Sequence, residues 1–138
     1  MRVMVFGTFD LLHPGHHSIL SCAESLGEVT VVVARSSTVR RIKGKSPIEP
    51  ENVRQRNIAK RFPSVTVVLG EKTDFLSPVR TYRPELILLG YDQQLPPGIS
   101  LDDLSCPIRR APALSPEKYK TSVIARKHRK MVDKNHIK

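Results

Sequence analysis

The chain has 138 residues, which is the usual length of one domain and is enough for a hydrophobic core without disulfides. No apolar run approaches the ~20 residues that a membrane-spanning helix requires, so no membrane partner is expected. The formal net charge of +10 favours anionic partners, which are nucleic acid, an anionic surface or phosphorylated small molecules.

The two cysteines, Cys22 and Cys106, form neither a CxxC motif nor a metal-binding spacing. We expect both to be reduced structural residues without a disulfide. The opening residues MRVMVF have too short an apolar run for a signal peptide, and no cleavage site of small residues follows them. A cytoplasmic location is therefore expected.

Apolar runs and helical periodicities alternate along the chain. Residues 2–7 predict a first buried strand, and the apolar positions of residues 14–26 have helical spacing. Further strands are expected at residues 29–34, 64–70 and 85–90, with a short one within 106–112. Further helices are expected within 46–62, at 74–82, where Pro78 interrupts a short helix, and from Thr121 onward. A basic loop is expected at 40–45 and a second loop at 93–103.

Strands that are apolar throughout and alternate with helices are typical of a parallel sheet covered on both faces. The sequence therefore predicts an α/β fold, a Rossmann-like three-layer α/β/α arrangement with a five-stranded parallel sheet. We expect one domain over residues 1–126 and a basic tail over residues 127–138. Ligands bind such sheets beyond the carboxyl ends of the strands.

Three of the five histidines directly follow the first predicted strand, in the stretch GTFDLLHPGHHSIL. Pro14 suits the first turn of a helix, so we expect the helix to begin near His13 with its free amides facing the strand end. His13 and His16 are three residues apart and can point the same way. Two imidazoles at a helix N-terminus suit a phosphate that gains negative charge during a reaction. A metal pair is the alternative, although it more often uses a spacing of four residues with further ligands.

Three residues near this pair are expected to lie outside the catalytic chemistry. Gly7 allows a sharp turn and the close approach of a ligand. His17 faces about 100° away from His16 and is expected at the surface. Asp10 is expected to hold local backbone or to position the histidines, without a catalytic role.

The stretch GTFDLLHPGH resembles the HxGH signature of a nucleotidyltransferase superfamily that includes glycerol-3-phosphate cytidylyltransferase and phosphopantetheine adenylyltransferase. The segments VVVARSSTVRRIKGKSPI, PENVRQR and LLGYDQ are similar to those of archaeal FAD synthetase, an FMN adenylyltransferase. The likeness covers residues 1–93 and returns at YKTSVI. It implies transfer of AMP from ATP to FMN, which gives FAD and pyrophosphate. It also implies a divalent cation, Mg²⁺, held more by phosphates than by side chains.

The resemblance and the positions of these motifs assign the site residues. The expected catalytic residues are His13, His16 and Lys43. The expected ATP-binding residues are Thr8, Phe9, His13, Pro14, Gly15, His16, Arg54, Asp92, Tyr119, Thr121 and Ser122. No residue is assigned to a metal.

Several of these roles have alternatives. Arg54 is expected to clamp phosphate with its planar guanidinium, and Asp92 to accept hydrogen bonds from the ribose or the adenine. A solvated basic segment at 40–45 and a turn-capping role for Asp92 are the alternatives. Gln93 either contacts the nucleotide or structures its loop.

The last predicted helix is expected to begin at Thr121 or Ser122 and to form a second anion site. The resembled superfamily often has a basic residue where this chain has Val123, and the possible substitutes are Lys120, Arg126 and Lys127.

Three other functions remain open. The first is a cytidylyltransferase that acts on glycerol 3-phosphate or another small phosphate ester. The second is a nucleic-acid-binding module, which the pI of about 10.1 suggests but for which no recognition motif is evident. The third is a flavin or nucleotide sensor without activity. A homodimer is common among the resembled proteins.

Overall fold

The structure, a computed structural model, describes residues 1–96 and 98–112. Five strands form one parallel sheet in the order β3-β2-β1-β4-β5, which confirms the predicted fold class. The strands are β1 Arg2–Gly7, β2 Glu28–Val33, β3 Thr66–Leu69, β4 Leu86–Leu89 and β5 Ile108–Arg110. The helices are α1 Pro14–Leu26, α2 Ser36–Lys43, α3 Glu51–Arg61 and α4 Ser77–Tyr82, with a 3₁₀ helix, η1, at Leu101–Asp103.

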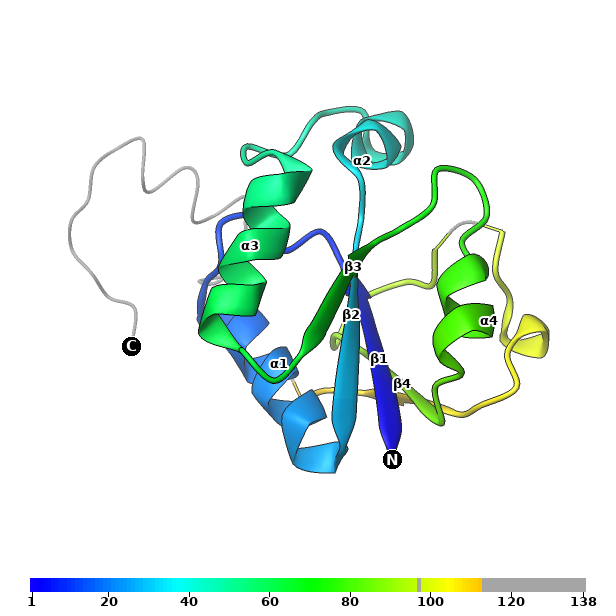
Figure 1. The fold of residues 1–138 in the computed structure, drawn as a ribbon. Helices are drawn as coiled ribbons and strands as arrows, with labels where there is room; N and C mark the ends of the chain where they lie inside the picture. The colour runs from blue at the N-terminus through cyan, green and yellow to red at the C-terminus, as the bar shows by residue number, and fades with distance from the viewer. Residues whose placement is uncertain (97, 113–138) are drawn as a thin grey trace.

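The central strand of the sheet is β1, which pairs with β2 on one side and β4 on the other. The chain first adds β2 and β3 outward on one side, and then crosses to β4 on the other side of β1. The carboxyl ends of β1 and β4 therefore lie at the topological switch point, where parallel sheets bind ligands. In Figure 1, α1 and α3 cover one face, α4 lies on the other, and α2 sits beyond the carboxyl ends of the strands.

The sheet is buried on both faces. Val3 and Val5 of β1 belong to one core cluster with Leu20 of α1, whereas Met4 belongs to the opposite cluster with Val79 of α4. Successive residues of a strand point to opposite faces, so a strand covered on both sides must be apolar at every position. This two-sided burial explains why the strands lack polar alternation.

Two elements correct the expectations. Residues 40–43 of the segment expected as a basic loop form the second half of α2, which buries only Thr38 and Val39 and has Gly44 as its C-cap with a left-handed φ of 83°. Pro78 does not interrupt a helix, because it lies in the first turn of α4, where its missing N–H is not needed. The final helix expected from Thr121 lies outside the described residues.

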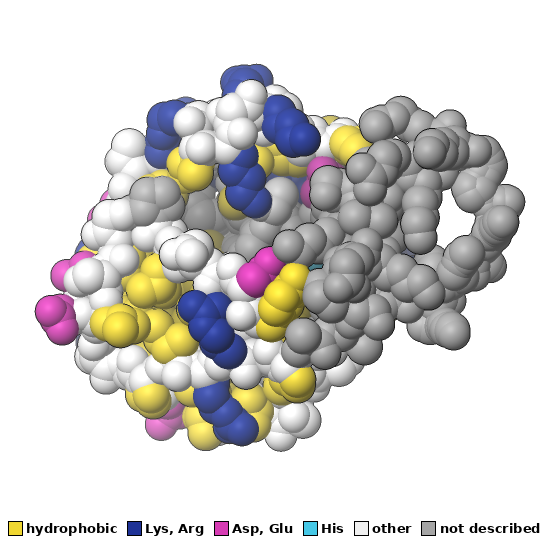
Figure 2. Space-filling view, turned by 180° about the vertical axis from the view of Figure 1, so that it is seen from behind, with side chains coloured by type: hydrophobic (Ala, Val, Ile, Leu, Met, Phe, Trp, Pro, Cys, Tyr) yellow, Lys and Arg dark blue, Asp and Glu magenta, His cyan; other side chains and the backbone are white. Residues whose placement is uncertain are grey.

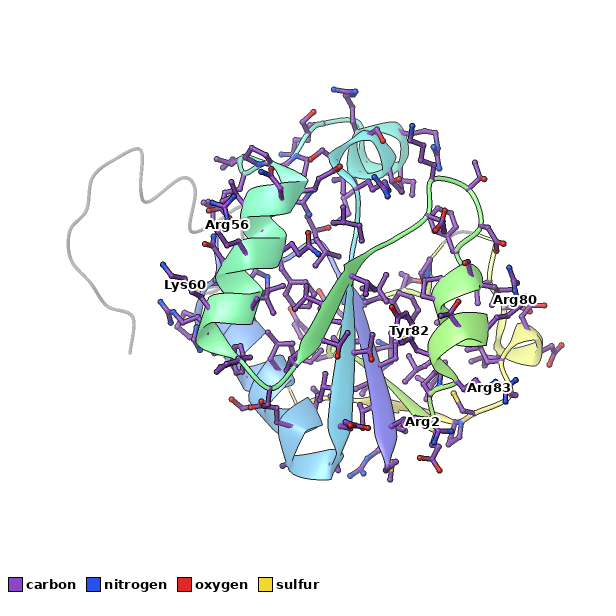
Figure 3. All side chains as sticks on the ribbon, in the orientation of Figure 1. Arg2, Arg56, Lys60, Arg80, Tyr82 and Arg83 are labelled. Carbon is purple, nitrogen blue, oxygen red and sulfur yellow. The ribbon has the colours of Figure 1, made fainter. Side chains whose placement is uncertain are left out.

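The amino ends of the strands are closed by structural contacts. Arg2 donates from Nε to the carbonyl oxygen of Arg83 at 2.7 Å, and its backbone amide donates to Glu85 Oε1 at 2.8 Å. Figure 3 shows Arg2 and Arg83 at the same end of the molecule, opposite α2. These contacts fix the end of α4 beside the start of β1.

Candidate active site

The turn between β1 and α1 brings the opening motif to the switch point. Phe9 and Leu11 have φ angles of 54° and 53°, which residues with side chains rarely adopt. The Phe9 ring is buried and lies so close to Gly7 that a Cβ at residue 7 would be 2.7 Å from Phe9 Cε2. Gly7 is therefore needed to make room for the Phe9 ring, which corrects the expectation that it forms the sharp turn.

Asp10 fastens this turn to the segment before α3. Its carboxylate accepts hydrogen bonds from the backbone amides of Ile48 at 2.7 Å and Glu49 at 2.9 Å. The carboxylate of Glu49 in turn accepts from the Leu11 amide at 2.9 Å. These bonds offset the conformational strain of the two positive φ angles. Asp10 was predicted to hold local backbone or to position the histidines, and it holds backbone that is distant in sequence, at residues 48 and 49.

His13 and His16 lie side by side at the start of α1. His13 is the N-cap residue, and its Nδ1 accepts a hydrogen bond from the Gly15 amide at 3.1 Å. The two imidazole rings are stacked, with centroids 3.8 Å apart and planes inclined by 22°. The Phe9 ring lies 5.3 Å from that of His16. The structure therefore brings together the two histidines that the motif predicted.

Burial keeps both rings neutral. Desolvation, with a smaller contribution from His17, lowers the pKa of His13 to about 4, and desolvation with repulsion from His13 and His17 lowers the pKa of His16 to about 3. Because Nδ1 of His13 accepts a hydrogen bond, its proton is on Nε2.

One nitrogen of each ring has no hydrogen-bond partner in the described part of the chain. His13 Nε2 and His16 Nδ1 are buried and have no hydrogen-bond partner within residues 1–96 and 98–112. Buried polar atoms without a partner are rare in folded proteins. These two nitrogens, which share this property with Thr38 Oγ1 of α2, are therefore candidates for atoms that bind a ligand.

His17 lies apart from this pair. Its Nε2 is 3.0 Å from Arg61 NH1, and its ring centroid is 5.3 Å from that of Phe62. The side chain is half-buried between α1 and the end of α3, not fully at the surface as expected. These contacts give His17 a packing role, which makes it a useful control for its neighbour His16.

The position of Arg54 corrects its predicted role as a phosphate clamp. The side chain is 0% exposed, so its planar face is not presented to a ligand. Its guanidinium donates four hydrogen bonds, to Glu49 O at 3.0 Å, Thr8 O at 2.8 Å, Ala34 O at 2.8 Å and Ser36 Oγ at 3.0 Å. Burial lowers the pKa of Arg54, and the carboxylates of Asp10, Glu51 and Glu49 oppose that shift. Arg54 therefore fixes the turn after β1, the end of β2 and the start of α2 relative to one another.

Basic side chains of α2 lie beyond the strand ends. Lys43 is the last residue of α2, Lys45 follows its C-cap, and both are exposed. Arg41 NH2 donates to Lys72 O at 2.9 Å and ties α2 to the segment after β3. Figure 2 shows Lys and Arg side chains along the upper edge of the molecule, where α2 lies, above a hollow in that face. Lys43 is thus on the same edge of the sheet as the histidines.

A second turn, Gly90–Gln93, follows β4. Gln93 Oε1 accepts from the Gly90 amide at 2.9 Å, and Gln93 Nε2 donates to Phe6 O at 2.7 Å. Gln93 therefore structures its loop, which was one of its two alternatives. Asp92 is exposed on this turn, next to the turn that leads to the histidines.

Tyr119, Thr121 and Ser122 lie outside the described residues, as do Val123 and the alternative cations Lys120, Arg126 and Lys127. Sequence reasoning missed two residues that support the site, Glu49 and Arg110. Nothing in the sequence indicates Glu49, because its contacts depend on the path of the segment before α3. Arg110 was indicated only by its place in the short strand predicted within residues 106–112.

No three His, Cys, Asp or Glu side chains among residues 1–96 and 98–112 are grouped as metal ligands. Both Asp10 oxygens accept from backbone amides. None of the helices in this same part of the chain has the length and apolar character needed to cross a membrane.

The fold and the histidine pair define a class of protein. Residues 4–104, which run from within β1 to beyond β4 and include both histidines, match the family model described as cytidylyltransferase-like. The chain belongs to the cytidylyltransferase-like family.

Two curated relatives are FAD synthases. The protein from Aciduliprofundum boonei is 48% identical over 95 residues, which cover 68% of this chain and 63% of the relative. The protein from Methanopyrus kandleri is 42% identical over 98 residues, which cover 68% of this chain and 65% of the relative. The chain thus spans less than two thirds of the length of either relative. A solved structure, the lipopolysaccharide core biosynthesis protein from Thermoplasma volcanium, is similar with a TM-score of 0.73 and 36% identity, over 83% of this chain and 98% of that chain.

Proposed function

We propose that this protein is an FMN adenylyltransferase, which transfers AMP from ATP to FMN and forms FAD and pyrophosphate. The observation that carries the proposal is the stacked pair of neutral imidazoles at the switch point, each with one buried nitrogen unpaired within the described chain. Identities of 42% and 48% to two FAD synthases support FMN as the acceptor.

In the proposed reaction, ATP lies across the carboxyl ends of β1 and β4. Its α-phosphate contacts the ring nitrogens of His13 and His16 and the amides near Thr8 and Phe9. An oxygen of the FMN phosphate attacks the α-phosphorus in line and forms a new P–O bond. The bond from the α-phosphorus to the bridging oxygen breaks, and its electron pair leaves with pyrophosphate. The protein contributes positioning and charge stabilisation, without a covalent intermediate.

The histidines act as hydrogen-bond donors to the transferring phosphate. The Nε2–H of His13 is unpaired in the described chain and strengthens its bond as negative charge develops on the α-phosphate. The triphosphate itself raises the pKa of both rings, because an adjacent anion favours the protonated form. Lys43 stabilises the departing pyrophosphate, and Asp92 holds the ribose or the adenine. Tyr119, Thr121 and Ser122 complete the proposed ATP site.

Mg²⁺ is the proposed cofactor. The donor set fits a cation held mainly by phosphate oxygens and water, since the described residues form no three-ligand cluster and Asp10 is engaged with two amides. When bound, the cation neutralises charge on the triphosphate.

One alternative enzyme activity has support. The family description favours a cytidylyltransferase, for which CTP and glycerol 3-phosphate are suitable substrates. A nucleic-acid-binding module is less well supported, because Figure 3 shows Arg56 and Lys60 on α3, and Arg80 and Arg83 on the opposite side of the sheet. A single basic stripe is the usual footprint for nucleic acid.

A substrate panel tests the proposal. The full chain is incubated with Mg²⁺, with ATP or CTP, and with FMN or glycerol 3-phosphate, and both pyrophosphate and the product mass are measured. We expect pyrophosphate and FAD only with ATP and FMN together. A cytidylylated product would support the alternative enzyme, and steeply salt-dependent duplex binding without any transfer would support a nucleic-acid module. Light scattering on the eluting protein tests the homodimer implied by the resemblance.

A further inference from the structure

A single side chain, Gln93, connects the two turns of the candidate site. Its Nε2 donates to Phe6 O at 2.7 Å, across 87 residues of sequence, and its Oε1 accepts from the Gly90 amide at 2.9 Å. The Gln93 backbone amide also donates to Gly90 O at 3.2 Å and closes the turn. One end of the side-chain amide is therefore bound to β1 and the other to the turn after β4.

Arg110 holds the same turn from β5. Its NH1 donates to Gly90 O at 2.9 Å and to Gln93 O at 2.7 Å. Arg110 lies opposite Leu89 in the β4–β5 pairing, so its guanidinium reaches the turn directly beyond that residue. Because Arg110 is exposed and Gln93 is half-buried, water competes more strongly for the bonds of Arg110.

The clamped turn presents two side chains to the edge where ligands bind. Tyr91 is 37% exposed, and Asp92 beside it is exposed as well. β1 and β4 are neighbours in the sheet, with Val5 opposite Leu88, so the two turns leave the sheet side by side. A turn fixed at both ends keeps Asp92 at a constant distance from the turn after β1.

We propose that Gln93 is a positioning residue that fixes the nucleoside-binding turn relative to the phosphate-binding turn, with Arg110 as its support. The inference rests on the proposed function, because it takes Asp92 as a nucleoside contact and His13 and His16 as phosphate contacts. By fixing the distance between these contacts, the Gln93 side chain then determines the position of the α-phosphorus of bound ATP. Such a role affects the rate, since a displacement of reacting groups by about 1 Å can reduce the rate about 10²-fold.

The variant Gln93→Met tests this role, because it keeps the length of the side chain and removes both of its hydrogen bonds. Calorimetry gives the Kd for ATP without FMN, and initial rates of FAD formation give kcat and the KM for each substrate. We expect the Kd and KM for ATP to rise about tenfold, kcat to fall, and the KM for FMN to stay within about twofold. A purely structural defect would lower the active fraction and leave the KM for ATP unchanged.

Gln55→Met is the matched control. Gln55 Nε2 also donates to a strand carbonyl, Val67 O at 3.1 Å, but on β3, two strands away from β1. Its Kd for ATP should equal that of the wild type. Arg110→Met should weaken ATP binding about threefold, less than Gln93→Met, because its bonds are exposed.

Unchanged ATP binding in a folded Gln93→Met variant would overturn the inference, and so would equal weakening of ATP and FMN. If Gln93→Met does not fold, the same measurements are made on Arg110→Met. An unchanged Kd for ATP in Arg110→Met would then overturn the inference. If the wild-type protein binds ATP without forming FAD, the proposed acceptor is wrong, and the Kd for ATP still decides the role of Gln93.

Discussion

The imidazole rings of His13 and His16 stack with their centroids 3.8 Å apart, in surroundings that keep both rings uncharged near neutral pH. A charged pair at this distance would repel itself, whereas a neutral pair can remain buried until an anion arrives. The site therefore offers directed hydrogen bonds in place of fixed positive charge. Positive charge is instead on α2, whose Lys43 is exposed at the same edge of the sheet.

Replacement of His16 by alanine should reduce FAD formation by about 10²–10³-fold, by analogy with the loss of one donor from an oxyanion site. His17→Ala is the neighbouring control, and it should stay within about threefold of the wild type because His17 contacts Arg61 and Phe62. Chromatographic measurement of FAD gives both rates. Turnover at the wild-type rate in His16→Ala would remove His16 from the mechanism.

The lowered pKa values of the two rings predict a dependence of stability on pH. Folding lowers the pKa of His13 from 6.5 to about 4 and the pKa of His16 from 6.5 to about 3. Between pH 6.5 and these lower values, the unfolded chain therefore binds more protons than the folded chain. The free energy of unfolding is therefore highest above pH 6.5 and decreases as the pH falls through this window. Urea unfolding at several pH values measures the slope.

The double variant His13→Gln/His16→Gln is the comparison for that slope, because glutamine does not titrate. Its free energy of unfolding should change less between pH 6.5 and 4 than that of the wild type. Equal slopes in the two proteins would show that the rings are not buried in the neutral form.

Arg54→Met should lower the free energy of unfolding by about 3–5 kcal/mol, because it leaves carbonyl oxygens unpaired and removes the positive charge that interacts with the carboxylates of Asp10, Glu51 and Glu49. Arg56→Met is the control on the same helix, since Figure 3 shows Arg56 on its outer side, and it should change stability by less than about 0.5 kcal/mol. Urea midpoints compare the two variants. A stable Arg54→Met protein that fails only to bind ATP would restore the direct phosphate contact.

Gly7→Ala should destabilise the protein by about 1–3 kcal/mol, because the added Cβ would lie 2.7 Å from the Phe9 ring. Gly70→Ala is the matched control at the end of β3, where the nearest atom would be Val32 Cγ1 at 3.4 Å, and its stability should change little. Thermal unfolding of both variants provides the comparison. Equal melting temperatures would show that Phe9 can move aside without a penalty.

The sequence was sufficient for the parts of the fold that depend on apolar patterning. The central strands have apolar residues on both faces because helices cover both sides of the sheet, and α1 has a regular apolar spacing that ends at Gly27. α2 escaped prediction because it buries only Thr38 and Val39 and gives no apolar period. The signals that indicate it are Gly44, a favoured residue after a helix, and the basic residues of the last turn.

The histidine pair was predictable because its two members are close in sequence, and helical geometry fixes their relative direction. The role of Arg54 was not predictable, because its four hydrogen-bond acceptors come from segments before and after β2 that only the folded chain brings together. The buried stripe of α3 is Arg54 and Ile58, continued by Phe62, and a charged residue in such a stripe has no signal in a hydrophobicity pattern.

The hydrogen bond from Gln93 to Phe6 also bears on how the protein is made. The two turns that it joins are 87 positions apart, and β4 must insert beside β1 before they meet. A growing chain that has completed β1, α1, β2 and β3 has an unpaired edge on β1 and only one of the two turns of the candidate site. The β1–β4 pairing joins the strands most distant in sequence, and a nucleotide that binds only when β4 is docked would stabilise that pairing by mass action.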